Sequence, residues 1–117
     1  MAWWRQRIVS FGHAFRGLGT LLREQVHARV HALATVVVLA LALWLEVSRH
    51  DAQVLVLIVC LVWLAEGMNT ALEYLSDAAV PQQHPLIGKA KDVAAGTVLL
   101  TSMFAVVLAG LTFFPYI

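Results

Sequence analysis

The sequence predicts an all-α membrane protein with three transmembrane helices, preceded by an amphipathic N-terminal helix at the membrane surface. Of its 117 residues, 61% are hydrophobic and 13% are charged, whereas a soluble domain carries about twice that share of charge. Three long apolar stretches also follow the N-terminal segment. We expect a single domain, because no internal repeat, linker or low-complexity tract interrupts the chain.

The N-terminal segment, residues 3–29, is expected to form the surface helix. Its large apolar residues recur at spacings of three and four, which places them on one face with arginines beside it. Such a face is typical of a helix that lies in the membrane interface. Packing against the protein's own helices is an equally good interpretation, and both can hold. The apolar face consists of Trp4, Ile8, Phe11, Phe15, Leu18 and Leu22.

The three transmembrane helices are expected over residues 30–48, 52–80 and 86–115. The first is short, but it reaches the length of about 17–20 residues that the hydrocarbon requires. The second is longer than the hydrocarbon is thick, so its C-terminal third should project beyond it. Pro81 ends this helix, and Pro85 is well placed in the first turn of the third.

The distribution of Lys and Arg predicts the orientation. Most of the basic residues lie before the first span and in the connection between the second and third spans. The positive-inside rule therefore places the N-terminus and that connection in the cytoplasm, and the C-terminus outside. The basic residues are Arg5, Arg7, Arg16, Arg23 and Arg29 in the N-terminal segment, Arg49 in the first loop, and Lys89 and Lys91 in the second.

The second span carries an unusual polar stripe. At about 100° per residue, Glu66, Asn69, Glu73 and Asp77 fall within a sector of roughly 80°. Glu66 directly follows an apolar run, so it lies at or just inside the membrane boundary. An ionisable residue at that depth is costly and is by default a candidate for function.

Lys91 and Asp92 open the third span on the same side of the membrane. With the stripe they supply carboxylates, an amide and an ammonium group, which suits phosphoryl transfer. Mg²⁺ takes one or two carboxylates plus substrate phosphates, a lysine neutralises phosphate charge, and a carboxylate can accept the hydroxyl proton. From spacing alone, a solvated helix end with local ion pairs is slightly favoured over this interpretation.

Residues Glu66 to Asp77 resemble the signature of the bacterial membrane diacylglycerol kinase family, Glu-x-x-Asn-(Ser/Thr)-Ala-hydrophobic-Glu-x-x-x-Asp. Lys89 to Gly96 is similar to the family's second block, Lys-Asp followed by small residues. The resemblance implies an ATP- and Mg²⁺-dependent lipid kinase in the bacterial inner membrane, assembled as a homotrimeric helical bundle with shared active sites. Oligomerisation also has a physical reason, since a lone chain would leave the stripe facing lipid.

The resemblance also implies roles for individual residues. Glu66 matches the catalytic base, and Glu73 matches a Mg²⁺ ligand that holds ATP. Asn69 and Asp77 match polar residues that shape the site. Residues that would contact ATP are Glu73, Lys91, Asp92, Gln82, Gln83 and His84, together with Gln25 and His13 from the N-terminal segment.

The second metal ligand departs from the family pattern. The family commonly has a metal-binding Glu four residues before an Arg, and counting back from Arg29 gives Gln25, with Glu24 one position earlier. The carbonyl oxygen of Gln25 could bind Mg²⁺ but adds no charge. Gln25 and Glu24 therefore both stay candidates for this ligand.

Other functions fit less well. A P-loop needs a glycine five positions before its Gly-Lys pair, where Gly88-Lys89 has Gln83. A small oligomeric transporter that uses Glu66 for ion coupling would not need the stripe to continue to Asp77. A non-catalytic assembly factor would not need the cluster at all, and no nucleic-acid partner is expected.

His27 and His31, four residues apart, form the only paired histidine spacing. Such a lone helical pair is more often interfacial than a metal site.

The substrate is predicted from a finer resemblance. His84-Pro85 and the run Ala94-Ala95-Gly96 look more like the undecaprenol kinase branch, so undecaprenol is the expected acceptor and diacylglycerol the alternative. We expect a lipid groove between the N-terminal helix and the spans. Its lining would be Phe11, Ala14, Phe15, Gly17, Leu18 and Gly19.

Overall fold

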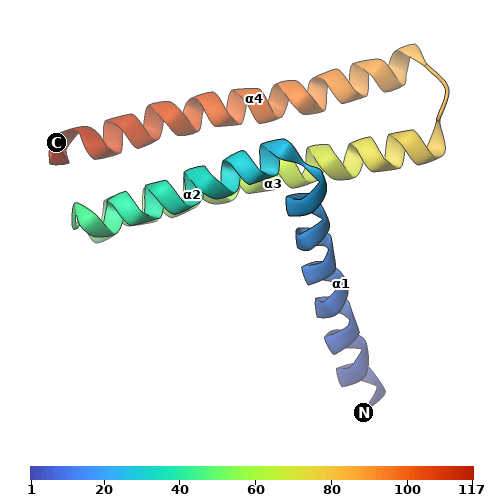
Figure 1. Ribbon diagram of the computed structural model, residues 1–117, viewed down its shortest axis with the longest axis horizontal. Coiled ribbons are helices and arrows are strands. Elements are labelled where there is room, and N and C mark those ends of the chain that lie inside the picture. Colours follow the sequence, from blue (N-terminus) through green and yellow to red (C-terminus); the bar gives the residue numbers. More distant parts are fainter.

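The computed structural model describes the whole chain, Met1 to Ile117, and it is helical throughout (Figure 1). Three of its helices are long and apolar enough to cross a membrane, which confirms the all-helical fold and the expected number of candidate spans. α2 and α4 both pack on α3, and α1 leaves the other helices crosswise at the start of α2. The elements are α1 (Ala2–Glu24), α2 (Val26–Trp44), α3 (Arg49–Ala79), α4 (Pro85–Phe113) and a final 3₁₀ turn, η1 (Phe114–Tyr116).

Very little of the protein is buried within its own chain. Only eight of 117 residues are buried, and five of these are hydrophobic. A soluble chain of this size would cover a much larger core. Exposed Val and Leu side chains instead run along α2, α3 and α4, so hydrocarbon is their solvent. The protein is therefore a multi-pass membrane protein.

Gln25 separates α1 from α2, and this corrects the expectation of one surface helix over residues 3–29. Gln25 is extended, with φ −110° and ψ 116°. The Arg29 guanidinium donates a hydrogen bond to the carbonyl oxygen of Arg23 at 3.1 Å, which satisfies one acceptor that the end of α1 leaves open. The break is required because α1 and α2 run in different directions (Figure 1), and a regular helix does not bend so sharply without one.

A tight turn joins α2 to α3. The Glu46 N–H donates to the Leu43 carbonyl at 3.3 Å, and the Val47 N–H donates to the Ala42 carbonyl at 3.2 Å. These two bonds form a Schellman motif. Glu46 occupies its left-handed position with φ 52°, where glycine is the usual residue. The turn therefore stores some backbone strain while reversing the chain at the end of the first span.

Tyr116, next to the C-terminal residue, is hydrogen-bonded to the segment that follows this turn. Ser48 caps α3 by accepting a hydrogen bond from the Asp51 N–H at 3.1 Å. The Tyr116 hydroxyl donates to the Asp51 carboxylate and accepts from the Ser48 N–H at 3.0 Å. A small core of Leu55 and Phe113 with Ile58 lies beside this network. The first turn of α3 and the end of α4 are thereby tied together.

At the opposite end, α3 and α4 extend beyond the α1–α2 junction (Figure 1). α3 has 31 residues, a length of roughly 45 Å against a hydrocarbon thickness of about 30 Å. α3 stops before Pro81, and α4 starts with Pro85 in its first turn. His84 caps α4, since its Nδ1 accepts a hydrogen bond from the Leu86 N–H at 3.1 Å.

Candidate active site

Glu66 is the one buried ionisable side chain in the protein, with 3% of its surface exposed. Its carboxylate oxygen Oε2 lies 3.6 Å from Nε2 of His31 on α2, whose side chain is 14% exposed. A buried carboxylate is costly unless a partner compensates it. The structure therefore confines Glu66 to the α2–α3 contact, with an imidazole as its charged or polar neighbour.

One turn earlier on α3, Trp63 makes a second contact with α2. Its indole Nε1–H donates to the Thr35 hydroxyl at 2.9 Å, and that hydroxyl donates to the His31 carbonyl at 2.7 Å. Glu66 lies one turn after Trp63 on α3, whereas its contact His31 lies one turn before Thr35, the contact of Trp63, on α2. The two contacts thus fix the antiparallel register that brings His31 to the depth of Glu66.

Asn69 and Glu73 continue the stripe on the next turns of α3. The Asn69 amide Nδ2 lies 3.4 Å from Glu73 Oε1, while the Asn69 Oδ1 and Thr70 Oγ1 atoms are buried without a partner. Unpaired buried acceptors are uncommon, and water or a ligand often explains them. This part of α3 therefore has polar capacity that the chain itself does not use.

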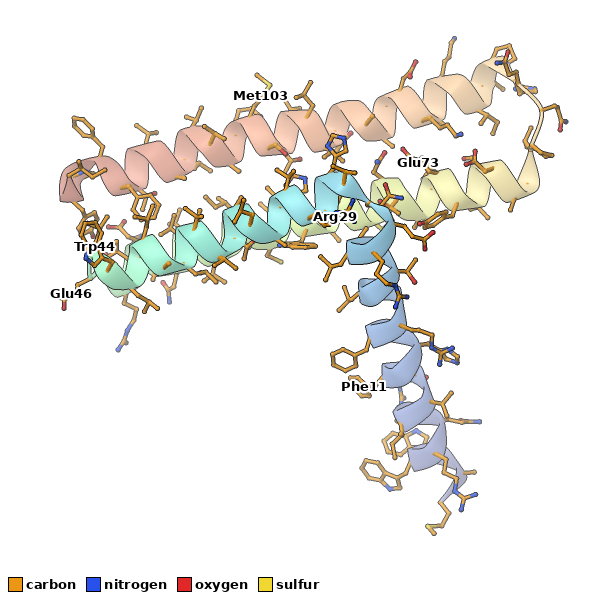
Figure 2. The ribbon with its side chains drawn as sticks, viewed as in Figure 1. Phe11, Arg29, Trp44, Glu46, Glu73 and Met103 are labelled. Carbon is orange, nitrogen blue, oxygen red and sulfur yellow. The ribbon has the colours of Figure 1, made fainter.

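Gln25 is brought to the same part of α3. Its amide Nε2 lies 3.4 Å from the hydroxyl of Tyr74, the residue after Glu73. Figure 2 shows Glu73 close to the α1–α2 junction, where Arg29 also lies. The break at Gln25 therefore allows a side chain from the junction to approach the acidic stripe.

These residues fit a metal–nucleotide complex better than a bare metal ion. No group of three or more His, Cys, Asp or Glu side chains is placed to hold a metal. Mg²⁺, however, needs only one or two carboxylates when phosphates and water complete its coordination. Glu73, the unpaired Oδ1 of Asn69 and the Gln25 carbonyl oxygen supply oxygen ligands of the kind that it prefers.

A polar hollow of about 590 Å³ lies at the α3–α4 turn. Its lining includes Asp77, Gln82, Gln83, His84 and Lys91, so the fold gathers five of the predicted site residues around one space. Lys91 Nζ forms an ion pair with Asp77 Oδ1, and both residues line the hollow. Since Nδ1 of His84 caps α4, only its Nε2 is left for a ligand.

Three other predicted residues are not drawn into this region. His13, Glu24 and Asp92 are exposed, and none of them forms a side-chain hydrogen bond or an ion pair within the chain. His13 lies on α1, which runs away from the other helices (Figure 1). Their roles stay predictions.

His31 and Tyr74 contact the predicted site residues although the sequence pattern did not point to them. The spacing of His27 and His31 by itself favours an interfacial pair. A signal was available: His31 lies near the start of the first span, and Glu66 lies in the later half of the second. Antiparallel neighbours bring two such positions to the same depth.

An apolar groove of about 740 Å³ lies between α3 and α4. Its polar lining residues are Asn69, Thr97 and Thr101. The expected lipid groove along α1 is corrected by this finding: Phe11 and Phe15 are exposed and do not line the groove. The physical reason is that α1 leaves the bundle crosswise, as Figure 2 shows for Phe11, and buries only Leu21.

The model of the prokaryotic diacylglycerol kinase family matches residues 12–113 of this chain, a range that contains Glu66 and all of α2, α3 and α4. The chain belongs to the prokaryotic diacylglycerol kinase family, a family of lipid kinases. Kinases of this family use ATP as co-substrate. The residues that carried the resemblance in the sequence therefore lie within a match that spans most of the chain.

Curated relatives agree with this assignment. The chain is 38% identical over 109 residues to a diacylglycerol kinase from Synechocystis, covering 92% of this chain and 62% of that protein. It is 32% identical over 106 residues to the undecaprenol kinase of Bacillus subtilis, covering 91% and 86% respectively. It is 29% identical over 100 residues to the diacylglycerol kinase of Escherichia coli, covering 86% and 82%. The chain thus spans less than two thirds of the Synechocystis protein and most of the other two.

Proposed function

We propose that this protein transfers the γ-phosphoryl group of ATP to the hydroxyl of a membrane lipid alcohol, with undecaprenol as the preferred acceptor and undecaprenyl phosphate as the product. The observation that carries this proposal is the buried Glu66 carboxylate, which begins a polar stripe leading toward a polar hollow. A carboxylate at the membrane boundary is where the hydroxyl of an interfacial lipid would meet a nucleotide from the cytoplasm.

Glu66 acts as the general base. The lipid hydroxyl oxygen attacks the γ-phosphorus, the bond from that phosphorus to the β–γ bridging oxygen breaks, and ADP leaves. The hydroxyl proton passes to the Glu66 carboxylate. Burial of Glu66 excludes bulk water from this position and so disfavours transfer of the phosphoryl group to water.

The hollow at the α3–α4 turn holds the nucleotide. Lys91 neutralises phosphate charge, and Asp77 keeps its ammonium group in place through their ion pair. Gln82, Gln83 and the Nε2 atom of His84 supply polar contacts at the rim of the same hollow. Asp92 and His13 complete the set of proposed nucleotide-binding residues.

Glu73 and Gln25 hold Mg²⁺, with Glu24 as the alternative to Gln25. Asn69 supports Glu73, since their side chains are 3.4 Å apart. When bound, Mg²⁺ neutralises the developing charge on the transferred phosphoryl group. The proximity of Gln25 to Tyr74, 3.4 Å between their side-chain atoms, supports the choice of Gln25 over Glu24.

In the membrane, α1 lies in the cytoplasmic interface as an amphipathic helix. Its crosswise direction relative to the spans (Figure 1) and its exposed Trp4, Phe11 and Phe15 support this placement. The Arg7 guanidinium lies 5.0 Å from the centre of the Trp3 ring, an arrangement suited to an interfacial aromatic residue. The N-terminus and the α3–α4 turn face the cytoplasm, and the C-terminus lies outside the bacterial inner membrane.

The active form is a homotrimer. The small number of buried residues supports it, because polar atoms such as Asn69 Oδ1 and Thr70 Oγ1 need partners that a single chain lacks. His13, carried away from the hollow by α1, could reach a nucleotide held by a neighbouring copy. Light scattering of the purified protein, corrected for bound detergent, should give a mass of three chains, and a monomer would contradict this.

Undecaprenol is favoured on two grounds. The Bacillus subtilis undecaprenol kinase is a relative at 32% identity, and the α3–α4 groove contains Ala65, Ala71, Ala94 and Ala105, which leave room for a methyl-branched isoprenoid chain. Diacylglycerol, giving phosphatidic acid, is the second candidate because the Synechocystis diacylglycerol kinase is 38% identical.

A phosphoryl-transfer assay tests the proposal. Purified protein in mixed micelles receives γ-labelled ATP and Mg²⁺ with undecaprenol, with diacylglycerol, or with no lipid alcohol. Label should appear in the lipid fraction only when a lipid alcohol is present, and ADP should form in equal amount. ATP hydrolysis without lipid labelling, or ion flux in vesicles without any ATP use, would contradict the lipid kinase and favour the transporter.

A further inference from the structure

We propose that His31 is a positioning residue for Glu66. Its imidazole Nε2–H holds one carboxylate oxygen of Glu66, so that the other oxygen is directed at the lipid hydroxyl. This inference rests on the proposed role of Glu66 as the base, and it assigns a function to a residue of α2 that lies outside the acidic stripe.

The geometry of the pair supports this role. Nε2 of His31 is 3.6 Å from Oε2 of Glu66, and this nitrogen is buried without a hydrogen-bond partner. A buried nitrogen of this kind is expected to have a partner, and the carboxylate is the charged group in reach. Catalytic hydrogen bonds are often long before substrate binds and shorten in the reacting complex.

The position of His31 is itself held by the neighbouring contact. Thr35 donates a hydrogen bond to the His31 carbonyl at 2.7 Å and accepts one from Trp63 at 2.9 Å. Trp63 lies on the same helix as Glu66, one turn away. The backbone of α2 at His31 is therefore fixed relative to the backbone of α3 at Glu66, which leaves the imidazole little freedom to move away.

The chemical consequence follows from the hydrogen-bond capacity of each group. When Oε2 of Glu66 accepts the hydrogen bond from His31, the lone pairs of Oε1 stay available for the incoming proton. Without a second contact, the flexible Glu66 side chain would sample several rotamers, and a shift of about 1 Å at a reacting group can cost about 100-fold in rate. His31 removes that freedom.

Three variants separate positioning from packing. His31→Leu keeps an apolar side chain of similar bulk but donates no hydrogen bond, and kcat should fall by about 10- to 100-fold while KM for ATP and for lipid changes little. His31→Gln should recover most of kcat, because its amide donates to the same oxygen. Val38→Ala is the matched control, since Val38 packs on α3 through the core of Leu55, Ile58 and Phe113, two turns from His31, and it should keep kcat near that of the unmodified protein.

Equal losses in Val38→Ala and His31→Leu, or a His31→Gln variant as slow as His31→Leu, would overturn the proposal. A second measurement does not depend on activity. With ¹⁵N-histidine labelling, Glu66→Gln should shift the His31 ring resonances, and Glu73→Gln should leave them in place. Unshifted His31 resonances in Glu66→Gln would overturn the pairing even in an active kinase. Full activity of Glu66→Gln would instead overturn the base role of Glu66 and this inference with it.

Discussion

The Glu66 carboxylate is buried, and this environment determines how a substitution at this position should affect the rate. Glu66→Gln keeps the size and hydrogen-bonding capacity of the side chain but removes the proton acceptor. We expect kcat to fall by at least about 100-fold, with the proposed trimer intact because Gln keeps the size and hydrogen-bonding capacity of Glu. Initial rates per folded protein measure this. Glu46→Gln, on the exposed turn at the other end of the bundle (Figure 2), is the matched control, and near-normal turnover of Glu66→Gln would exclude Glu66 as the base.

Glu73 is the proposed metal ligand that carries charge, so its loss should appear first in the Mg²⁺ requirement. Glu73→Ala should raise the Mg²⁺ concentration for half-maximal rate sharply, because the remaining oxygen donors are neutral. Gln25→Glu should lower it, since it adds a carboxylate beside Tyr74. Mg²⁺ titrations of the rate at fixed ATP measure both effects. If Glu24→Ala raises the Mg²⁺ requirement and substitutions at Gln25 do not change it, the second ligand is Glu24 and the assignment is wrong by one residue.

At the scale of elements, α3 combines two environments in one helix. Its first part packs against α2 and α4 through Leu55 and Ile58, whereas its last turns carry Glu73 to the α1–α2 junction and Asp77 one turn beyond it. The hairpin ends differ accordingly. The Glu46 turn is tight and strained, while the turn from Val80 to His84 is open and surrounds the polar hollow.

The Tyr116 network at the far end predicts a change in stability without a change in chemistry. Tyr116→Phe removes a hydrogen bond to the Asp51 carboxylate and one from the Ser48 N–H. We expect the free energy of unfolding in detergent to fall by about 1–2 kcal/mol, with kcat per folded protein unchanged because the network lies at the opposite end from Glu66.

Asp51→Ala supplies the check on this stability prediction. The losses of unfolding free energy caused by this substitution and by Tyr116→Phe should not add in the double variant, since both remove the hydrogen bond between Tyr116 and Asp51. Full additivity, or a loss of kcat in Tyr116→Phe, would show that Tyr116 acts in another way.

The whole molecule decides lipid selectivity. The proposed proton transfer to Glu66 would be the same for both lipids, so we expect discrimination to come from how the lipid chain fits the α3–α4 groove. We expect a higher kcat/KM for undecaprenol than for diacylglycerol in the same mixed micelles. A hydrophobic groove separates modest shape differences by only about 1–3 kcal/mol, so residual activity with diacylglycerol is expected.

A groove variant makes this selectivity test sharper. Ala94→Leu narrows the α3–α4 groove and should lower kcat/KM for undecaprenol more than for diacylglycerol. Ala14→Leu on exposed α1 is the control and should affect neither. Equal or better efficiency of the unmodified protein with diacylglycerol would reverse the substrate assignment and leave the lipid kinase in place.

The sequence by itself determined the helical content, the three spans and the polar stripe. These follow from local rules: apolar length, a period of 3.6 residues, and prolines such as Pro81 and Pro85 at helix ends. The same periodicity placed Asn69 and Glu73 on one face, and the structure brings their side chains within 3.4 Å of each other.

Only the tertiary structure decided which helices meet and at what level. The break at Gln25, the pairing of His31 with Glu66, and the location of the apolar groove beside α4 rather than α1 all depend on the direction in which α1 leaves α2 and on the register of α2 against α3. That register is set by the Glu46 turn and by contacts such as Trp63 with Thr35. No local period contains this information, because packing between distant segments selects it.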